Sequence, residues 1–190
     1  MHRLLRSASV AGASDVLVNL MDVLCEAGAD AGATARAAAV HEERRALEAL
    51  IRRGVRVDLA LAAALHRFSE FVRLLPVATG EERHLAFAVA SQYGGVEMVR
   101  MLLDAWEYPN RYNPVGGHSH GTPLHQTAGF GYLELVRLLV ERGGQTDWKD
   151  VLWGGTPEDW ARHEGRVEVA ESLREVDEAM SKATADPLQG

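Results

Sequence analysis

One stretch of this chain occurs more than once, and that repetition limits the folds open to it. GVEMVRMLLDAW (Gly95–Trp106) and YLELVRLLVERG (Tyr132–Gly143) carry Glu, Val, Arg and Leu at matching places, and a third copy lies within GTPEDWARHEGRVEVAESL. The glycines that precede the copies, Gly94, Gly131 and Gly165, are 37 and then 34 residues apart. Periods of about 20 to 50 residues indicate stacked supersecondary units, because one unit cannot bury its apolar face alone.

Each unit has the pattern of two helices. The Thr-Pro pairs at 122–123 and 156–157 are helix starts, since a hydroxyl caps the first turn and proline has no N–H to leave unpaired there. Gly131 separates the first helix from the second, whose apolar residues in 135–140 recur at helical spacing. Gly143 is expected to end that second helix in a left-handed conformation.

These residues carry a family resemblance. GTPLHQTAGFGYLELVRLLVERG (Gly121–Gly143) closely resembles an ankyrin repeat, Gly154–Leu173 matches it with Glu-Asp in place of Leu-His, and Leu85–Trp106 matches without the Thr-Pro pair. The motif residues are Thr122, Pro123, Leu124, His125, Gly131, Gly143, Thr156, Pro157 and Gly165. The resemblance implies an all-α solenoid of about five to six helix pairs with finger loops projecting between them.

The expected organisation is a single ankyrin repeat domain over residues 1–180. Clear repeats are expected at 85–120 and 121–153, a C-terminal cap at 154–178, and a flexible tail at 181–190, after degenerate repeats in 1–84.

Three segments carry the pattern in the degenerate part. Ala46–Asp58 reads as a second helix with its closing glycine, Leu59–Pro76 as a whole helix pair, and Leu20–Asp30 as the end of a repeat.

Charge and cysteine content exclude several classes of protein. The formal net charge of −7 argues against a nucleic-acid partner, whose binders usually carry a basic face. Cys25 is the only cysteine, so no internal disulfide or cysteine-based zinc site can form, which fits a reducing, cytoplasmic setting. Asp15, Asn19 and Asp22 interrupt the apolar N-terminal stretch, which argues against a signal peptide, and no run is long enough to span a membrane.

The sequence offers little for catalysis. It has no nucleophile elbow, phosphate loop or His-Glu-x-x-His motif, so we expect neither an enzyme nor a cofactor. His118 and His120 could offer two imidazoles to zinc, and a metal-binding or enzymatic protein that uses this loop stays open as the alternative. The family resemblance gives His125 a structural role, a hydrogen bond to the adjoining turn.

Aromatic residues are the main functional signal. All tryptophans and tyrosines lie between Tyr93 and Trp160, which packing alone does not require. In repeat register several occupy positions that the family directs to the concave face or the fingertips. The expected partner-binding residues are Tyr93, Trp106, Tyr108, Tyr112, Phe130, Tyr132, Trp148 and Trp153.

Trp106 is the clearest of these candidates, because it occupies the position at which the next repeat has Gly143. A non-glycine residue held left-handed costs roughly 1–2 kcal/mol, whereas a tryptophan anchor at an interface contributes roughly 2 kcal/mol or more. The competing interpretation is an ordinary helix end with the ring packed on Tyr108 or Pro109.

We therefore predict a non-catalytic module that binds another protein, with self-association as a further option and with no nucleic-acid or membrane partner. The aromatic surface is open to two origins, natural divergence or engineering on an ankyrin scaffold.

Overall fold

The computed structural model describes residues 30–185, and side chains as far as residue 182. Cys25, residues 186–190 of the predicted tail, and all but the last residue of the repeat end predicted at Leu20–Asp30 lie outside the described residues.

The described chain is built from helices joined by turns and loops, and it contains no strand. The helices are α2 (Ala31–Val40), α3 (Arg44–Arg52), α4 (Leu59–Ala64), α5 (Phe68–Leu74), α6 (Gly80–Gln92), α7 (Val96–Asp104), α8 (Pro123–Phe130), α9 (Leu133–Glu141), α10 (Pro157–His163) and α11 (Val167–Ala185), with a 3-10 turn at Leu75–Val77.

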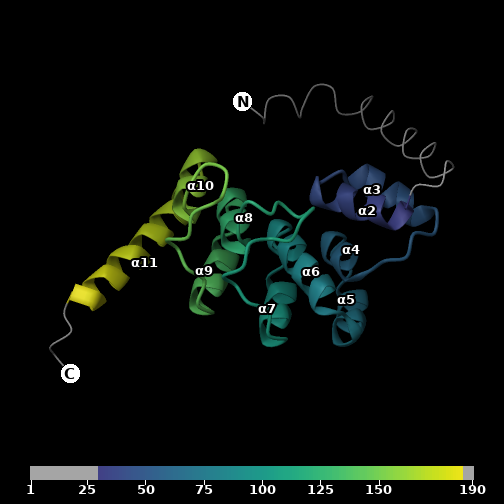
Figure 1. The fold of residues 1–190 in the computed structure, drawn as a ribbon, viewed down its shortest axis with the longest axis horizontal. Coiled ribbons are helices and arrows are strands. Elements are labelled where there is room, and N and C mark those ends of the chain that lie inside the picture. Colours follow the sequence, from purple (N-terminus) through teal and green to yellow (C-terminus); the bar gives the residue numbers. More distant parts are fainter. Residues whose placement is uncertain (1–29, 186–190) are drawn as a thin grey trace.

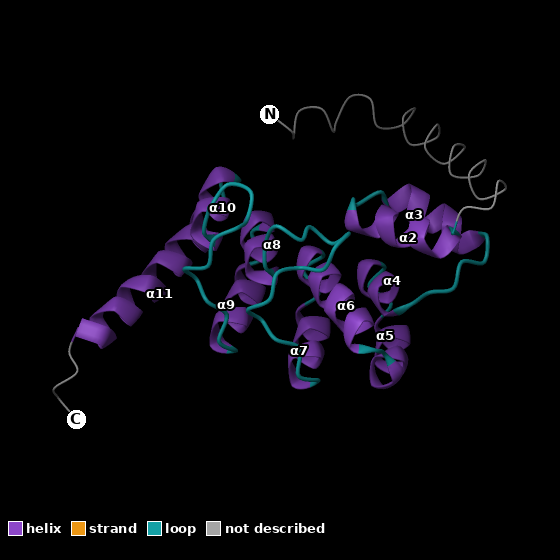
Figure 2. Ribbon diagram, viewed as in Figure 1, coloured by secondary structure: helices purple, strands orange, loops and turns teal. Residues whose placement is uncertain are grey.

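The helices form five pairs that stack side by side (Figures 1 and 2). Each first helix contacts the next first helix, in the order α2, α4, α6, α8 and α10, and these five form one layer. The second helices α7, α9 and α11 contact one another in turn and form the other layer. The chain is therefore the all-α solenoid that the repeats predicted.

The layers differ in composition because they differ in burial. The inner first helices α4, α6 and α8 lie between first helices on both sides, so small side chains suit them, and all six residues of α4 (LALAAA) are buried. Second helices bury one stripe, which in α9 consists of Leu135, Val136, Leu138 and Leu139. The core that results runs continuously through the stack.

A left-handed residue follows the first helix of every pair. It is glycine at 94, 131 and 165, but Glu42 (φ 58°) and His66 (φ 53°) take this place in the two N-terminal pairs. The same closing hydrogen bond forms with or without glycine: the amide of Arg67 donates to Ala62 O at 2.9 Å, and that of Gly95 donates to Ala90 O at 2.8 Å. In the pairs α2/α3 and α4/α5 a side chain therefore stands in place of this glycine, while the turn itself is retained.

Two boundaries differ from those predicted. The pair expected to begin at 85 starts with α6 at Gly80, where the Thr79 hydroxyl accepts the amide of Glu82 and the Glu82 carboxylate accepts that of Thr79. At the other end α11 continues to Ala185, past the cap expected to end at 178. The helix continues because this part of the chain has no glycine or proline and carries an Arg174–Glu178 pair one turn apart.

Candidate functional site

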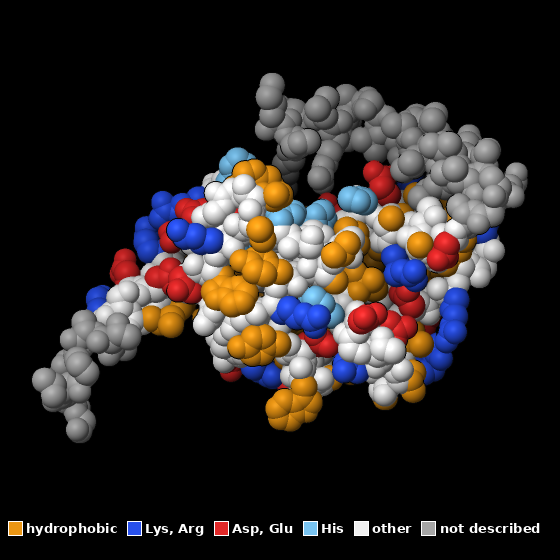
Figure 3. All heavy atoms as spheres, viewed as in Figure 1, with side chains coloured by type: hydrophobic (Ala, Val, Ile, Leu, Met, Phe, Trp, Pro, Cys, Tyr) orange, Lys and Arg blue, Asp and Glu red, His pale blue; other side chains and the backbone are white. Residues whose placement is uncertain are grey.

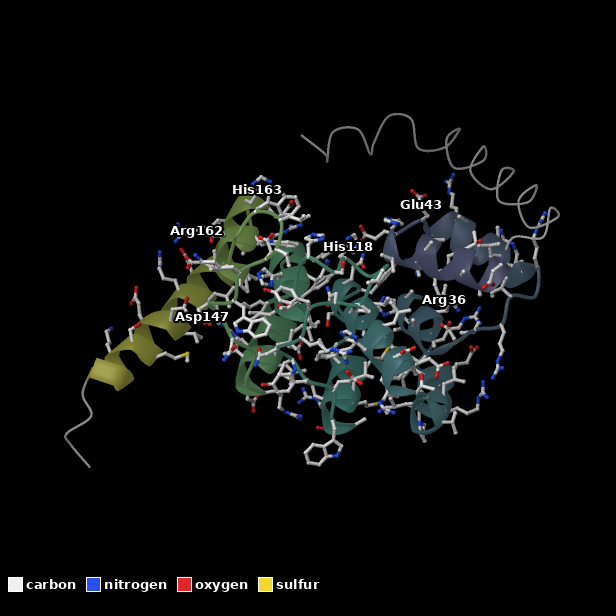
Figure 4. All side chains as sticks on the ribbon, in the orientation of Figure 1. Arg36, Glu43, His118, Asp147, Arg162 and His163 are labelled. Carbon is white, nitrogen blue, oxygen red and sulfur yellow. The ribbon has the colours of Figure 1, made fainter. Side chains whose placement is uncertain are left out.

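A groove of about 880 Å³ runs along the layer of first helices. Its floor comes from the ends of α2 and α6 and from α8 and α10, and its rim comes from the two long loops of the C-terminal half. We call residues 105–122, between α7 and α8, the first finger loop, and residues 142–156, between α9 and α10, the second finger loop. Figure 4 shows His118 of the first loop and His163 of α10 on the same side of the stack.

The first finger loop is fixed at its base and at its tip. At the base, the amide of Asn113 donates to Gly121 O at 2.9 Å. At the tip, His118 is left-handed (φ 62°), and its Nε2 lies 3.1 Å from Val40 O at the end of α2. A carbonyl only accepts, so this nitrogen carries the proton. The Gln92 side chain donates to the same carbonyl at 2.8 Å, so the end of α6 and the first finger loop are both tied to the end of α2 at one atom.

Asp150 holds the second finger loop from within. Its carboxylate accepts the amides of Leu152, Trp153 and Gly155 at 2.7–2.9 Å and the indole N–H of Trp160 at 3.0 Å. Burial alone would raise the pKa of this carboxyl, but the four donors, with Trp160 the strongest, together lower it to about 2. Trp160 is thereby fixed in the groove wall, and Trp153 is held beside it.

Rings from both fingers and from α10 contact one another along the groove. His118 and His120 lie 6.0 Å apart between centroids, His120 lies 5.3 Å from Trp153 and 5.5 Å from Trp160, and the two indoles are 6.0 Å apart. His41 at the end of α2 extends the series, 5.9 Å from His118. Burial, followed by the neighbouring His118, lowers the pKa of His120, so this ring is neutral near pH 7.

The arrangement of His118 and His120 does not favour a metal site. The two rings meet edge to face at 86°, and Nε2 of His118 is engaged by Val40 O. Within residues 30–185 no group of three or more His, Cys, Asp or Glu side chains is placed to hold a metal ion. The alternative of metal-dependent chemistry on this loop therefore has no ligand set in the described part of the chain.

His125 lies in the structural position that the family resemblance implied. Its Nδ1 lies 2.8 Å from the Thr122 hydroxyl and accepts the Thr122 amide at 3.2 Å, while Nε2 lies 3.1 Å from Gly155 O. Burial lowers the pKa of this imidazole and keeps it neutral. The ring thus joins the start of α8 to the second finger loop.

The aromatic residues predicted to bind a partner fall into three groups instead of one surface. The first group lies outside the groove, on the finger loops: Trp106 is 93 % exposed and Tyr108 64 %, and the rings of Tyr112 and Trp148 contact each other at 5.5 Å. We call Trp106, Tyr108, Tyr112 and Trp148 the outer patch. Figure 3 shows apolar side chains in a broken band over this face, near the ends of α7 and α9.

Trp106 has the left-handed geometry expected of a glycine position. Its φ is 67°, against 87° for Gly143, and the closing amide of each helix end reaches back to the equivalent carbonyl. With 93 % of its surface exposed, the ring does not pack on Tyr108 or Pro109 as the competing interpretation required.

The second group fills space between repeats. The Tyr93 hydroxyl donates to Ala39 O at 2.7 Å, and burial raises the pKa of Tyr93 to about 12. The Tyr132 ring lies against Gly94 and stacks on Phe130, with the planes 7° apart. Tyr93 and Tyr132 therefore contribute to the packing of the stack, and neither joins the outer patch.

Phe130 and Trp153 make up the third group, which lines the groove, and here Trp160 and His163 were missed by the sequence reasoning. In repeat register Trp160 is equivalent to Gln126, one position after the tetrad histidine, and both side chains face the groove. That register was the signal that could have found Trp160.

Stacked antiparallel helix pairs with finger loops beside a groove define an α-solenoid repeat protein. The family model for ankyrin repeats (3 copies) matches residues 85–183. The chain belongs to the ankyrin-repeat family.

Curated relatives of this chain differ in how much of their own length the match covers. Cyclin-dependent kinase 4 inhibitor B of Bos taurus is 32% identical over 124 residues, which is 50% of this chain and 92% of that protein. Ankyrin repeat and SAM domain-containing protein 6 of Mus musculus is 34% identical over 98 residues, and the potassium channel GORK of Arabidopsis thaliana 33% over 96 residues. These matches cover 52% and 50% of this chain but only 11% of each relative.

Among residues 30–185 no helix is both long enough and apolar enough to cross a membrane.

Proposed function

We propose that this chain is a non-catalytic module that binds another protein through its C-terminal half. Rings of the groove would enter the partner's surface, and the finger loops would hold those rings in place. Ankyrin repeats and relatives such as the kinase inhibitor support the general class of protein-interaction modules. The single-cysteine composition supports a cytoplasmic setting as part of the same proposal.

The observation that carries the proposal is the fixed geometry of Trp153, Trp160 and His120. Trp153 is 72 % exposed, yet its amide is held by Asp150, and its ring contacts both His120 and Trp160. An exposed ring that is already held loses little conformational freedom on binding, and such preorganised tryptophans are typical interface anchors.

The outer patch is a second candidate surface for the same function. An indole that is 93 % exposed on a left-handed residue gives the folded monomer no packing energy, so a partner or a second copy of the chain would offset its cost. The proposal applies equally to natural divergence and to an engineered surface.

The test compares the two surfaces in one assay. Tagged wild type, Trp153→Ala and Trp106→Gly are used to capture proteins from a host lysate, and each candidate partner is then purified and titrated by calorimetry. We expect Trp153→Ala to weaken a genuine complex by about tenfold or more, the loss typical of an anchor residue. A complex that Trp153→Ala leaves intact and Trp106→Gly abolishes would move the binding site to the outer patch, and a complex insensitive to both would refute the proposal.

A further inference from the structure

The groove has an uneven charge. Carboxylates of Glu42, Asp150, Asp159 and Glu164 line it, whereas no lysine or arginine does so within the described residues. The His120 ring on the rim is neutral near pH 7, so it does not compensate these charges. The surface presented to a partner is therefore acidic.

Three of the four carboxylates already take part in interactions, and Glu42 is one of them. Asp150 accepts four hydrogen bonds from its own loop and from Trp160, and Asp159 accepts the amide and the hydroxyl of Thr156 at the start of α10. Glu164, at the exposed end of α10, makes no ion pair or side-chain hydrogen bond within residues 30–185. Its carboxylate is thus available to a group from outside.

Aromatic rings share the groove with this carboxylate. Trp153, Trp160 and Phe130 line the same groove as Glu164, and Trp153 leaves most of its ring in solvent. A cation placed over an indole face is attracted by the ring, and arginine adds planar stacking and a two-pronged hydrogen bond to a carboxylate. Lysine offers the charge without the plane.

We propose that the groove recognises an arginine-bearing, basic segment of the partner protein. The guanidinium would stack on Trp153 and pair with Glu164. This proposal rests on the proposed function and specifies its partner. Charge complementarity selects this occupant over an acidic or purely apolar one.

The test uses short fluorescein-labelled peptides that differ only at two positions, occupied by arginine, lysine, citrulline or glutamate. Binding to the full chain is followed by fluorescence anisotropy near pH 7, at low and at physiological salt. We expect the arginine peptide to bind about tenfold more tightly than the citrulline peptide, which has nearly the same shape without the charge, and its affinity to fall as salt increases. Equal affinity for arginine and citrulline, or preference for glutamate, would overturn the proposal.

Matched variants locate the contact. Glu164→Gln should weaken the arginine peptide by about threefold to tenfold and leave the citrulline peptide unchanged, and Trp153→Ala should weaken both. Glu168→Gln, an equivalent charge loss on the exposed start of α11, is the control, and circular dichroism checks that each variant is folded. An arginine peptide that binds both groove variants as tightly as wild type would place the contact elsewhere and refute the site.

Other occupants give different results. The chain's own N-terminal segment carries two arginines, Arg3 and Arg6, and could compete for an acidic groove. If peptide binding emerges only after Arg3→Gln/Arg6→Gln, that segment is the occupant, and the proposal of a partner segment fails. If sedimentation shows a dimer that Trp153→Ala dissociates, with no peptide binding, the occupant is a second copy. A partner protein that requires Trp153 but contains no basic segment would refute this inference while leaving the proposed function intact.

Discussion

The two finger loops have the same backbone features at their start and base, but different side chains hold them in place. Each follows a second helix that ends in a left-handed residue, Trp106 in one and Gly143 in the other. Each is closed at the base by a backbone hydrogen bond, from Asn113 in the first loop and from Asp150 in the second, at 2.9 and 2.8 Å.

The side chains at these equivalent base positions differ. Asp150 accepts three backbone amides and one indole N–H, whereas the Asn113 amide group is buried and has no hydrogen-bond partner in the described part of the chain. The first loop instead reaches across the groove to Val40 through His118. The shorter loop therefore has an internal anchor in addition to its bond with His125, whereas the longer loop lacks such an anchor and is tied to a distant repeat, so the order of the groove depends on both ends of the stack.

The largest expected effect comes from removing the internal anchor. Asp150→Ala leaves three loop amides and the Trp160 indole without an acceptor, and we expect a loss of about 3 kcal/mol in the free energy of unfolding. Urea unfolding followed by circular dichroism measures it. A loss no larger than that of Asn113→Ala, the same truncation at the equivalent base position, would show that the two loops are held alike.

Acid should affect the second loop selectively. The pKa of Asp150 is depressed from 3.8 to about 2, so its contribution is complete above about pH 4 and is lost as the pH falls through 2. Asp150→Asn lacks this titration, and the stability difference between wild type and variant should shrink as the pH falls from 5 to 2. We expect a smaller effect than for Asp150→Ala because the amide oxygen keeps part of the acceptor role. A difference that stays constant over this range would contradict the depressed pKa.

The fold was predictable where the repeat motif is complete, and less so elsewhere. Thr122, His125 and the glycines at 131, 143 and 165 mark helix ends that the structure confirms, since their chemistry is local. The N-terminal turns at Glu42 and His66 were not predictable, because tertiary packing imposes a left-handed conformation that their sequence does not favour.

The site was harder to predict than the fold. The sequence shows that the tryptophans and tyrosines lie in the C-terminal half. It does not distinguish rings that fill gaps between repeats, such as Tyr93, from rings that line the groove. That distinction depends on neighbours far along the chain: Tyr93 binds Ala39 O, and His118 binds Val40 O.

Exchanges at the two left-handed residues, Trp106 and Gly143, should change the stability less, and in opposite directions. Gly143→Ala should cost about 1 kcal/mol through backbone strain alone, because a Cβ there meets no atom within 4 Å. Trp106→Gly should stabilise the chain by about 0.5 kcal/mol, since relief of strain exceeds the entropy cost of glycine. Thermal unfolding measures the change in Tm of both variants. A fall in Tm for Trp106→Gly would show that the indole contributes packing that its exposure does not suggest.

The smallest effect is expected at Asn113. The residue is 3 % exposed, and neither its side-chain nitrogen nor its side-chain oxygen bonds to the described residues, so truncation removes buried polar atoms together with some packing. These terms oppose each other, and Asn113→Ala should change the free energy of unfolding by no more than about 0.5 kcal/mol. Asn113→Asp is a sharper test of the difference between the loops. It places an aspartate in the first finger loop at the position equivalent to Asp150 in the second. If the first loop could use that anchor, the variant would gain stability; we expect a loss, because the longer loop turns through Gly117 N–H to Pro114 O and gives the carboxylate no equivalent row of amides.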